Sequence, residues 1–499
     1  MSNLSSKAAV IAFGAGIAQL ITVLSTVILA RILTQADLGT YKQIFLIYHL
    51  LAPIFITGIP ASIYYFLARL KKEDEKKLFV ARSISLLFIL GLLLGVFVSL
   101  SSLWAPKLMQ NPQLGILLIV FGVYAFAHVS EQFFQPILVL YNRVKMLLVY
   151  PLAKGVLIFS FTIASALIFN KNLVLIVLSV SLISLLLPIF AIVYTKNLLS
   201  LKTLMKIDLK NYKAQLAYGI PLALTSVVGI IAWEFDKLVV SINFPPELYA
   251  VYVLGATEIP FVGLIRSSVT QVILPEMSRE YAEGKVKHLV DIWHNSIRKL
   301  SIVILPIFVL AMVFSKEIIT TLYSEKFASS VPYFRIYLLL LIVRVASYGI
   351  ILQAIGKTRE NLKGSVAFFT VNAVLNPVLV VFLGLIGPAI ATVISTFTNV
   401  IYYIVVIKRF MKFSLRDIFP WYSVSKNFFI AVLAGIVFVP IILFLDVPDL
   451  PRLIASTLIY SLVYFLIIYK FAILTDADKR FIKRTSNKAL RLLRVNYDG

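Results

Sequence analysis

Residues 214–244 read AQLAYGIPLALTSVVGIIAWEFDKLVVSINF, a hydrophobic run that carries Glu234, Asp236 and Lys237 near its end. As an α-helix these 31 residues would extend about 45 Å, and the hydrocarbon core of a bilayer is about 30 Å thick. A charged side chain at membrane depth is costly, so it faces a polar cavity or an opposite charge. The stretch predicts a membrane-spanning helix whose charged end lines a polar space.

The composition of the whole chain also indicates a membrane protein. Hydrophobic residues make up 60% of the 499 residues, charged residues only 14%, and the mean hydropathy is +0.94. The net charge of +24 is typical of cytoplasmic loops rich in lysine and arginine, and we expect no nucleic-acid partner. Because cysteine is absent, disulfides, thiolate metal sites and cysteine nucleophiles are excluded. With four histidines, we expect no metal centre.

Hydrophobic runs of about 20 residues, separated by charged or turn residues, predict an all-α integral membrane protein with fourteen transmembrane helices. The connections between them are too short for a soluble catalytic module, so we expect no enzyme activity. The predicted spans are 8–31, 41–68, 78–104, 113–141, 146–169, 172–194, 214–243, 249–275, 296–323, 332–355, 361–384, 387–407, 424–445 and 451–473.

The basic residues orient these spans. Most of the 47 lysines and arginines fall in the two tails and in every second connection, including the KKEDEKK run at residues 71–77. Cytoplasmic loops carry such an excess of positive charge. Both termini are therefore predicted to be cytoplasmic.

A short internal repeat predicts two lobes. Residues 33–41, LTQADLGTY, follow the first span, and residues 244–252, FPPELYAVY, follow the seventh. Because six spans separate the two segments, the lobes would form a parallel repeat of six helices each, followed by two further helices. The predicted domains are an N-lobe at 1–195, a cytoplasmic linker at 196–213, a C-lobe at 214–412, the last two helices at 413–473 and a basic cytoplasmic tail at 474–499.

We single out eight ionisable side chains inside the predicted spans, which either line a polar cavity or pair across helices. Arg266 and Arg344 lie nearest the middle of the membrane. Glu258 and Arg266 are eight residues apart, which would place them on a similar face of one helix. His128 and Glu131, three residues apart, are compatible with a proton relay or with a structural hydrogen-bonded pair. The eight residues are Glu131, Lys154, Glu234, Asp236, Lys237, Glu258, Arg266 and Arg344.

Several local patterns together resemble the polysaccharide transporter family, the Wzx-type lipid-linked oligosaccharide flippases of the superfamily that includes the MATE exporters. They are RILTQADLGTY at residues 31–41, Asp236-Lys237, LPEMSR at residues 274–279 and GLIGPA at residues 384–389. The resemblance covers most of the chain. It implies two six-helix lobes around a central cavity, alternating access and no covalent chemistry.

The resemblance also implies a substrate, a polyprenyl-pyrophosphate-linked oligosaccharide that crosses the plasma membrane for cell-surface polysaccharide biosynthesis. Its expected partners are membrane lipids, a polysaccharide polymerase and glycosyltransferases. No cofactor is expected beyond a proton or sodium ion that drives transport. The expected head-group residues are Arg266, Arg344, Lys154, Lys237, Arg31 and Lys42. The residues expected to couple ions or to pair charges are Asp236, Glu234, Glu258, Glu131 and His128.

Three alternatives remain open at this point. A lipid II flippase fits the same fourteen-helix plan. A MATE-type small-molecule exporter fits less well, because the first span carries no acidic residue. A membrane glycan polymerase or ligase belongs to a different class, and the absence of a large outer loop and of a catalytic cluster argues against it.

Overall fold

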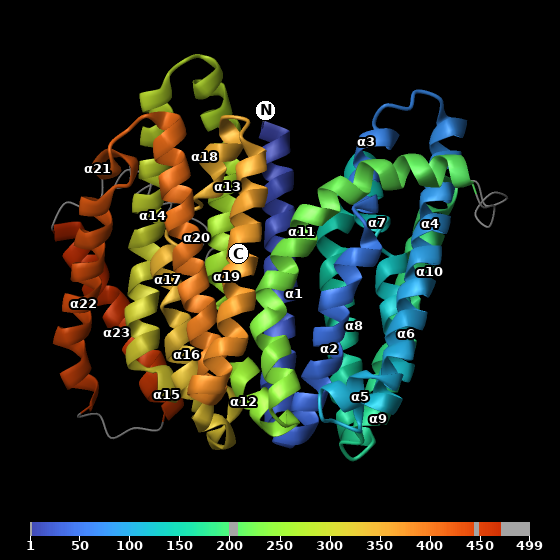
Figure 1. Ribbon diagram of the computed structural model, residues 1–499, viewed down its shortest axis with the longest axis horizontal. Helices are drawn as coiled ribbons and strands as arrows, with labels where there is room; N and C mark the ends of the chain where they lie inside the picture. The colour runs from blue at the N-terminus through green and yellow to red at the C-terminus, as the bar shows by residue number, and fades with distance from the viewer. Residues whose placement is uncertain (1, 199–207, 444–448, 471–499) are drawn as a thin grey trace, which may run out of the picture.

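The computed structural model describes residues 2–198, 208–443 and 449–470, and every regular element in these residues is a helix (Figure 1). The predicted all-α class is therefore confirmed. The predicted basic tail at 474–499 and residues 199–207 of the predicted linker lie outside the described residues.

The first half of the chain forms a bundle, on the right in Figure 1. Its elements are α1 (Ser2–Ile32), α2 (Gln35–Ile56), α3 (Ile59–Leu67), α4 (Glu73–Leu100), η1 (Ser101–Leu103), α5 (Ala105–Leu108), α6 (Leu114–Ser130), α7 (Phe134–Leu140), α8 (Val144–Ile168), α9 (Leu173–Ser184), α10 (Leu186–Thr195) and η2 (Lys196–Leu198).

The second half forms another bundle, and its last two long helices, α22 and α23, lie at the outer edge against α14 and α15. Its elements are α11 (Leu209–Asn243), α12 (Pro246–Gly255), α13 (Pro260–Ala282), α14 (Val286–Val313), α15 (Ser315–Tyr323), η4 (Glu325–Ser330), α16 (Val331–Leu338), α17 (Leu340–Val343), α18 (Gly349–Ala354), α19 (Thr358–Leu383), η5 (Gly384–Ile386), α20 (Gly387–Met411), α21 (Leu415–Ile418), α22 (Trp421–Leu443) and α23 (Asp449–Lys470).

Many of these helices are long and apolar enough to cross a membrane. Within the described residues nine stretches meet that test, or ten when the two halves of α11, bent by 43°, count as one span. Each segment predicted from the sequence coincides with one helix or with consecutive helices. The count of fourteen stays a prediction.

Several spans predicted to be continuous are broken, and three of the breaks hold an ionisable residue. Glu131 lies between α6 and α7, Glu258 between α12 and α13, and Arg344 between α17 and α18. The prediction that Glu258 and Arg266 share one helix is therefore wrong. Pro260 is the first residue of α13, where its fixed φ angle and missing N–H suit a helix start.

The breaks recur at corresponding positions of the two halves. Glu131 interrupts the fourth predicted span and Arg344 the tenth, which is six spans later. The second and eighth spans are likewise divided, into α2 and α3 and into α12 and α13. Interrupted helices in corresponding positions of two repeats mark the binding site in many transporters. This agreement supports the predicted two-lobe division.

The halves meet along α1, α2, α11 and α12. Helix α1 contacts α8 of the first half and α13 and α15 of the second, and α2 contacts α11 and α12. Gly39 of α2 touches the backbone of α12 so closely that a Cβ atom there would lie 1.9 Å from the carbonyl oxygen of Pro246. The glycine of the LTQADLGTY segment is therefore required for this crossing.

Candidate functional site

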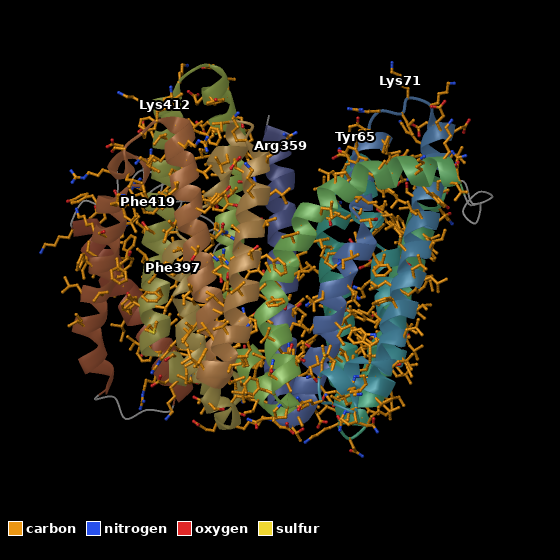
Figure 2. The ribbon with its side chains drawn as sticks, viewed as in Figure 1. Tyr65, Lys71, Arg359, Phe397, Lys412 and Phe419 are labelled. Carbon is orange, nitrogen blue, oxygen red and sulfur yellow. The ribbon has the colours of Figure 1, made fainter. Side chains whose placement is uncertain are left out.

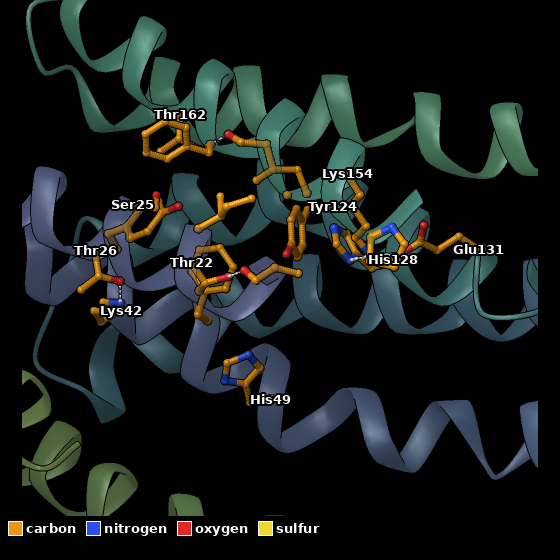
Figure 3. Close-up of a pocket in the computed structure, with 18 of the residues that line it drawn as sticks. Thr22, Ser25, Thr26, Lys42, His49, Tyr124, His128, Glu131, Lys154 and Thr162 are labelled. Carbon is orange, nitrogen blue, oxygen red and sulfur yellow. Dashed lines mark hydrogen bonds and ion pairs between the residues drawn. The ribbon is translucent and has the colours of Figure 1, made fainter. Parts of the chain in front are cut away.

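One cavity, of about 730 Å³, lies between the helices of the first half and the face of α11 and α12 (Figure 3). Its walls come from α1, α2, α6, α7, α8, α11 and α12. We call it the first cavity. Its ionisable lining residues are Lys42, His49, His128, Glu131, Lys154, Glu234 and Lys237.

Glu131 is the centre of a polar cluster in the first cavity. Its side chain is 5% exposed and accepts hydrogen bonds from the hydroxyl of Tyr150 and the ammonium of Lys154. His128 Nδ1 lies 3.3 Å from Lys154 Nζ and 3.8 Å from Glu131 Oε1. Because Glu131 occupies the break between α6 and α7, its carboxylate reaches across to α8. His128 and Glu131 therefore form one cluster with Lys154 and Tyr150.

The other two lysines of the first cavity differ in their partners. Lys237 Nζ lies 3.2 Å from a carboxylate oxygen of Glu234 on the same helix. Lys42 Nζ donates to Thr26 Oγ1 at 2.9 Å and has no acidic partner among the described residues. With three lysines against two glutamates, and with neutral histidines, the lining carries one net positive charge.

A smaller cavity of about 250 Å³ lies among the helices of the second half, and we call it the second cavity. Arg344 projects from the break after α17, donates to Glu258 Oε1, and lies with its guanidinium carbon 4.6 Å from the ring centroid of Trp233. Arg266 lines the same cavity, and its guanidinium has no ion pair or hydrogen bond to any described residue. The two arginines nearest the predicted membrane midplane thus share one cavity.

Helix α11 separates the two cavities. Trp233 lines the second cavity, whereas Glu234 and Lys237 line the first. The charged end of residues 214–244 therefore does line a polar space, and the same turn of helix reaches both cavities.

Asp236 lines neither cavity. It is fully buried and accepts hydrogen bonds from the hydroxyls of Tyr252, at 2.7 Å, and Tyr337. Its Oδ1 has no hydrogen-bond partner among the described residues and lies 3.9 Å from Lys237 Nζ. A buried carboxylate oxygen without a donor is a hard ligand suited to a proton or to a small cation. No cluster of three or more metal-ligating side chains occurs in the described part of the chain.

Arg31 lies outside both cavities, at the end of the molecule where the halves touch. It donates to the backbone carbonyls of Thr321 and Leu322 in α15. Gln35 Nε2 donates to the carbonyl oxygen of Lys326 at 2.5 Å, and Lys326 Nζ donates to that of Leu33 at 2.6 Å. These bonds join the α1–α2 turn to the α15–η4 turn.

Among the residues of the first cavity that were not predicted from the sequence, two carry a signal in it. Tyr150 precedes Lys154 by four residues, the spacing that places two side chains on one helix face. His49 interrupts the apolar run of α2 and lines the cavity. Both signals were present in the sequence: the i,i+4 spacing for Tyr150 and a polar side chain within a span for His49.

The helical fold is shared with solved structures of transporters. The structure of "Lipid II flippase MurJ, inward closed conformation" is 18% identical, covers 93% of this chain and 99% of that one, and superposes with a TM-score of 0.73. An inward-facing MATE transporter of the MOP superfamily, also 18% identical, covers 79% of this chain and 94% of its own with a TM-score of 0.62. At 18% identity these likenesses show the fold alone.

The family follows from the sequence matches. The family model described as "Polysaccharide biosynthesis protein" matches residues 28–332, and the chain belongs to this family. A second model, "Lipid II flippase MurJ", matches residues 248–456. The "Probable low-salt glycan biosynthesis flippase Agl15" of Haloferax volcanii is 24% identical over 242 residues, which are 47% of this chain. The match spans half the length of that relative.

Proposed function

We propose that the protein is a flippase that moves a polyprenyl-pyrophosphate-linked oligosaccharide across the plasma membrane by alternating access, for the biosynthesis of a cell-surface polysaccharide. The observation that carries this proposal is the pair of cavities beside α11, each lined by more basic than acidic side chains. Membership of the polysaccharide biosynthesis family and the fold support it.

In this proposal the lysines of the first cavity receive the pyrophosphate. A pyrophosphate that leaves water loses its hydration, and fixed ammonium groups replace part of it. Lys42 is available at once because it bonds only a hydroxyl, whereas Lys154 and Lys237 exchange a carboxylate for a phosphate oxygen. Arg266 and Arg344 of the second cavity complete the head-group site by binding the glycan that is attached to the pyrophosphate. No covalent bond to the substrate is made or broken.

The carboxylates give the cavity a second state. When phosphate takes Lys154, Glu131 keeps the hydrogen bond from Tyr150 but loses its cation, and a coupling ion would take the place of that cation. We propose Asp236 as the binding site of a coupling proton or sodium ion, because its Oδ1 has no hydrogen-bond donor among the described residues. Both groups would tie substrate binding to ion binding.

The proposed orientation places both termini in the cytoplasm and the Arg31 contact at the outer face. A glycan assembled by glycosyltransferases on the inner side would enter the cavities from there. After release at the outer face it would pass to a polysaccharide polymerase. Membrane lipids would surround the polyprenyl chain throughout.

The direct experiment uses the purified protein in liposomes with a fluorescent polyprenyl-pyrophosphate saccharide. We expect the label to become accessible to a membrane-impermeant quencher while the lipid stays chemically unchanged. Transport of a cationic dye alone would instead indicate a small-molecule exporter, and a lengthened glycan would indicate a polymerase. Absence of any translocation by protein that is folded and inserted would contradict the proposal.

Lipid II is the second candidate substrate, favoured by the family-model match over residues 248–456 and by the TM-score of 0.73. The same liposomes distinguish the two. Flipping of fluorescent lipid II in preference to a lipid-linked oligosaccharide without a peptide would support this alternative.

A further inference from the structure

The second cavity differs from the first in size and in chemistry. Its volume of about 250 Å³ lies just under the range of roughly 300–1,000 Å³ typical of small-molecule pockets. It therefore suits a single sugar ring better than a pyrophosphate with its attached glycan. Its lining combines arginines with aromatic rings, amides and hydroxyls, namely Trp233, Arg266, Thr270, Arg344, Ser347, Tyr348, Gln353, Thr396, Asn399 and Tyr403.

Two buried polar atoms of this lining have no hydrogen-bond partner among the described residues. They are Asn399 Oδ1, an acceptor, and Arg344 Nε, a donor. A buried polar atom left without a partner costs free energy, so each calls for a ligand atom of the opposite kind. Because a sugar hydroxyl both donates and accepts, neighbouring hydroxyls of one ring can satisfy both atoms.

The charge of the second cavity sets a further condition on the ligand. Arg344 forms an ion pair with Glu258, and Arg266, which forms no ion pair with a described residue, lies in the field of the same carboxylate, so two arginines and one glutamate leave one net positive charge. One uncompensated guanidinium matches one negative charge, and its planar fork matches the two oxygens of a carboxylate. A pyrophosphate carries more than one negative charge and is better matched by the three lysines of the first cavity.

The aromatic residues fit the same ligand. Trp233 and Tyr348 each pack against a second residue. Trp233 contacts the guanidinium of Arg344, and Tyr348 stacks on Phe419 with their ring centroids 6.2 Å apart. Aromatic side chains that are already fixed offer a ligand an apolar surface and, on Trp and Tyr, a polar group, and little side-chain entropy is lost when the ligand binds. The apolar face of a sugar ring can pack against such walls.

We infer that the second cavity is a subsite for a carboxylate-bearing sugar of the lipid-linked glycan, with Arg266 binding the carboxylate and Asn399 and Arg344 binding ring hydroxyls. This inference rests on the proposed flippase function. It names the substrate class as a glycan that contains a uronic acid or another carboxylated sugar.

The test compares two fluorescent polyprenyl-pyrophosphate disaccharides in proteoliposomes, identical except that one ends in glucuronic acid and the other in glucose. We expect the wild-type protein to bind the acidic lipid about tenfold more tightly, as one charge-assisted contact allows. In Arg266→Gln the ratio of the two affinities should fall to about one. Asn399→Ala should weaken the binding of both lipids and leave their ratio intact.

The control is Arg359→Gln, the same change at an exposed arginine near the start of α19 (Figure 2). It should keep both the flipping rate and the ratio. Equal affinities in the wild type, or an unchanged ratio in Arg266→Gln, would overturn the subsite inference while leaving the flippase proposal standing. Failure of the wild type to flip either lipid would instead count against the proposed function itself.

Discussion

Lys154 and Glu131 form an ion pair within the membrane-spanning region, and only the glutamate is fully buried. The side chain of Glu131 is 5% exposed and that of Lys154 is 24% exposed. Removing one partner of a buried pair leaves the other charge uncompensated. When both side chains are fully shielded from water, this lowers the free energy of unfolding by about 3–5 kcal/mol. For Lys154→Met we expect a smaller loss, about 2 kcal/mol, because partial exposure weakens the pair.

Thermal unfolding in detergent measures this loss. The double variant Lys154→Met with Glu131→Gln should recover most of the lost stability, since the glutamine side chain carries no charge and can still accept a hydrogen bond from Tyr150. If the double variant is no more stable than Lys154→Met, the pair does not hold these helices together.

Asp236 supports a prediction about energy coupling. Asp236→Asn keeps an oxygen that can accept from Tyr252 and Tyr337 but removes the charge that would hold a cation. We expect flipping in liposomes to lose its response to an imposed sodium or pH gradient. Glu247→Gln, at an exposed acidic residue of α12, is the matched control and should keep that response. A variant of Asp236 that still follows the gradient would remove this residue from the coupling step.

The sequence allowed the residue types of the site to be predicted but not their grouping. The cost of charge in lipid singles out Lys154, Lys237, Arg266 and Arg344 as cavity or pairing residues. Which of them meet depends on tertiary packing: the two arginines line one cavity and the two lysines the other. Arg31 has a basic side chain as they do, and only the structure shows that it binds carbonyls of α15.

At the scale of helices, hydropathy predicts where apolar segments run and misses where they break. The segment 249–275 contains Pro260, a known signal for a helix boundary, at the start of α13. The break that holds Arg344 is different, since residues 344–348 read RVASY and contain neither proline nor glycine. Apolar flanks kept both segments continuous in the prediction, whereas the structure divides them.

Gly39 supports a prediction about the contact between α2 and α12. In Gly39→Ala the new Cβ would collide with the backbone of Pro246, and because backbone cannot rotate aside the helices must separate. Overpacking of this kind costs about 1–3 kcal/mol. Gly229→Ala in α11 meets no atom within 4 Å and should be neutral or slightly stabilising. Thermal unfolding of the two variants side by side checks this, and equal midpoints would contradict it.

At the scale of the whole molecule, the two halves are joined at the lower end of Figure 1, where α12 and α15 lie. Arg31 and Gln35 of the first half donate to backbone carbonyls of the second, and Lys326 donates back to Leu33. In the proposed alternating-access cycle, this end would open when the glycan leaves. Because Arg31 and Lys326 are exposed, the bonds can break without leaving a buried charge unpaired.

A covalent bond across this contact should therefore stop transport. The chain contains no cysteine, so in Gln35→Cys with Lys326→Cys the two introduced thiols are the only ones that a cross-linker can join. We expect a short thiol cross-linker to abolish flipping, and a reducible one to restore it after reduction. Glu360→Cys with Lys363→Cys, one turn apart on α19, should be cross-linked without loss of flipping, since no boundary between the halves is crossed. Flipping at the normal rate by the Gln35–Lys326 cross-linked protein would show that the halves need not part here.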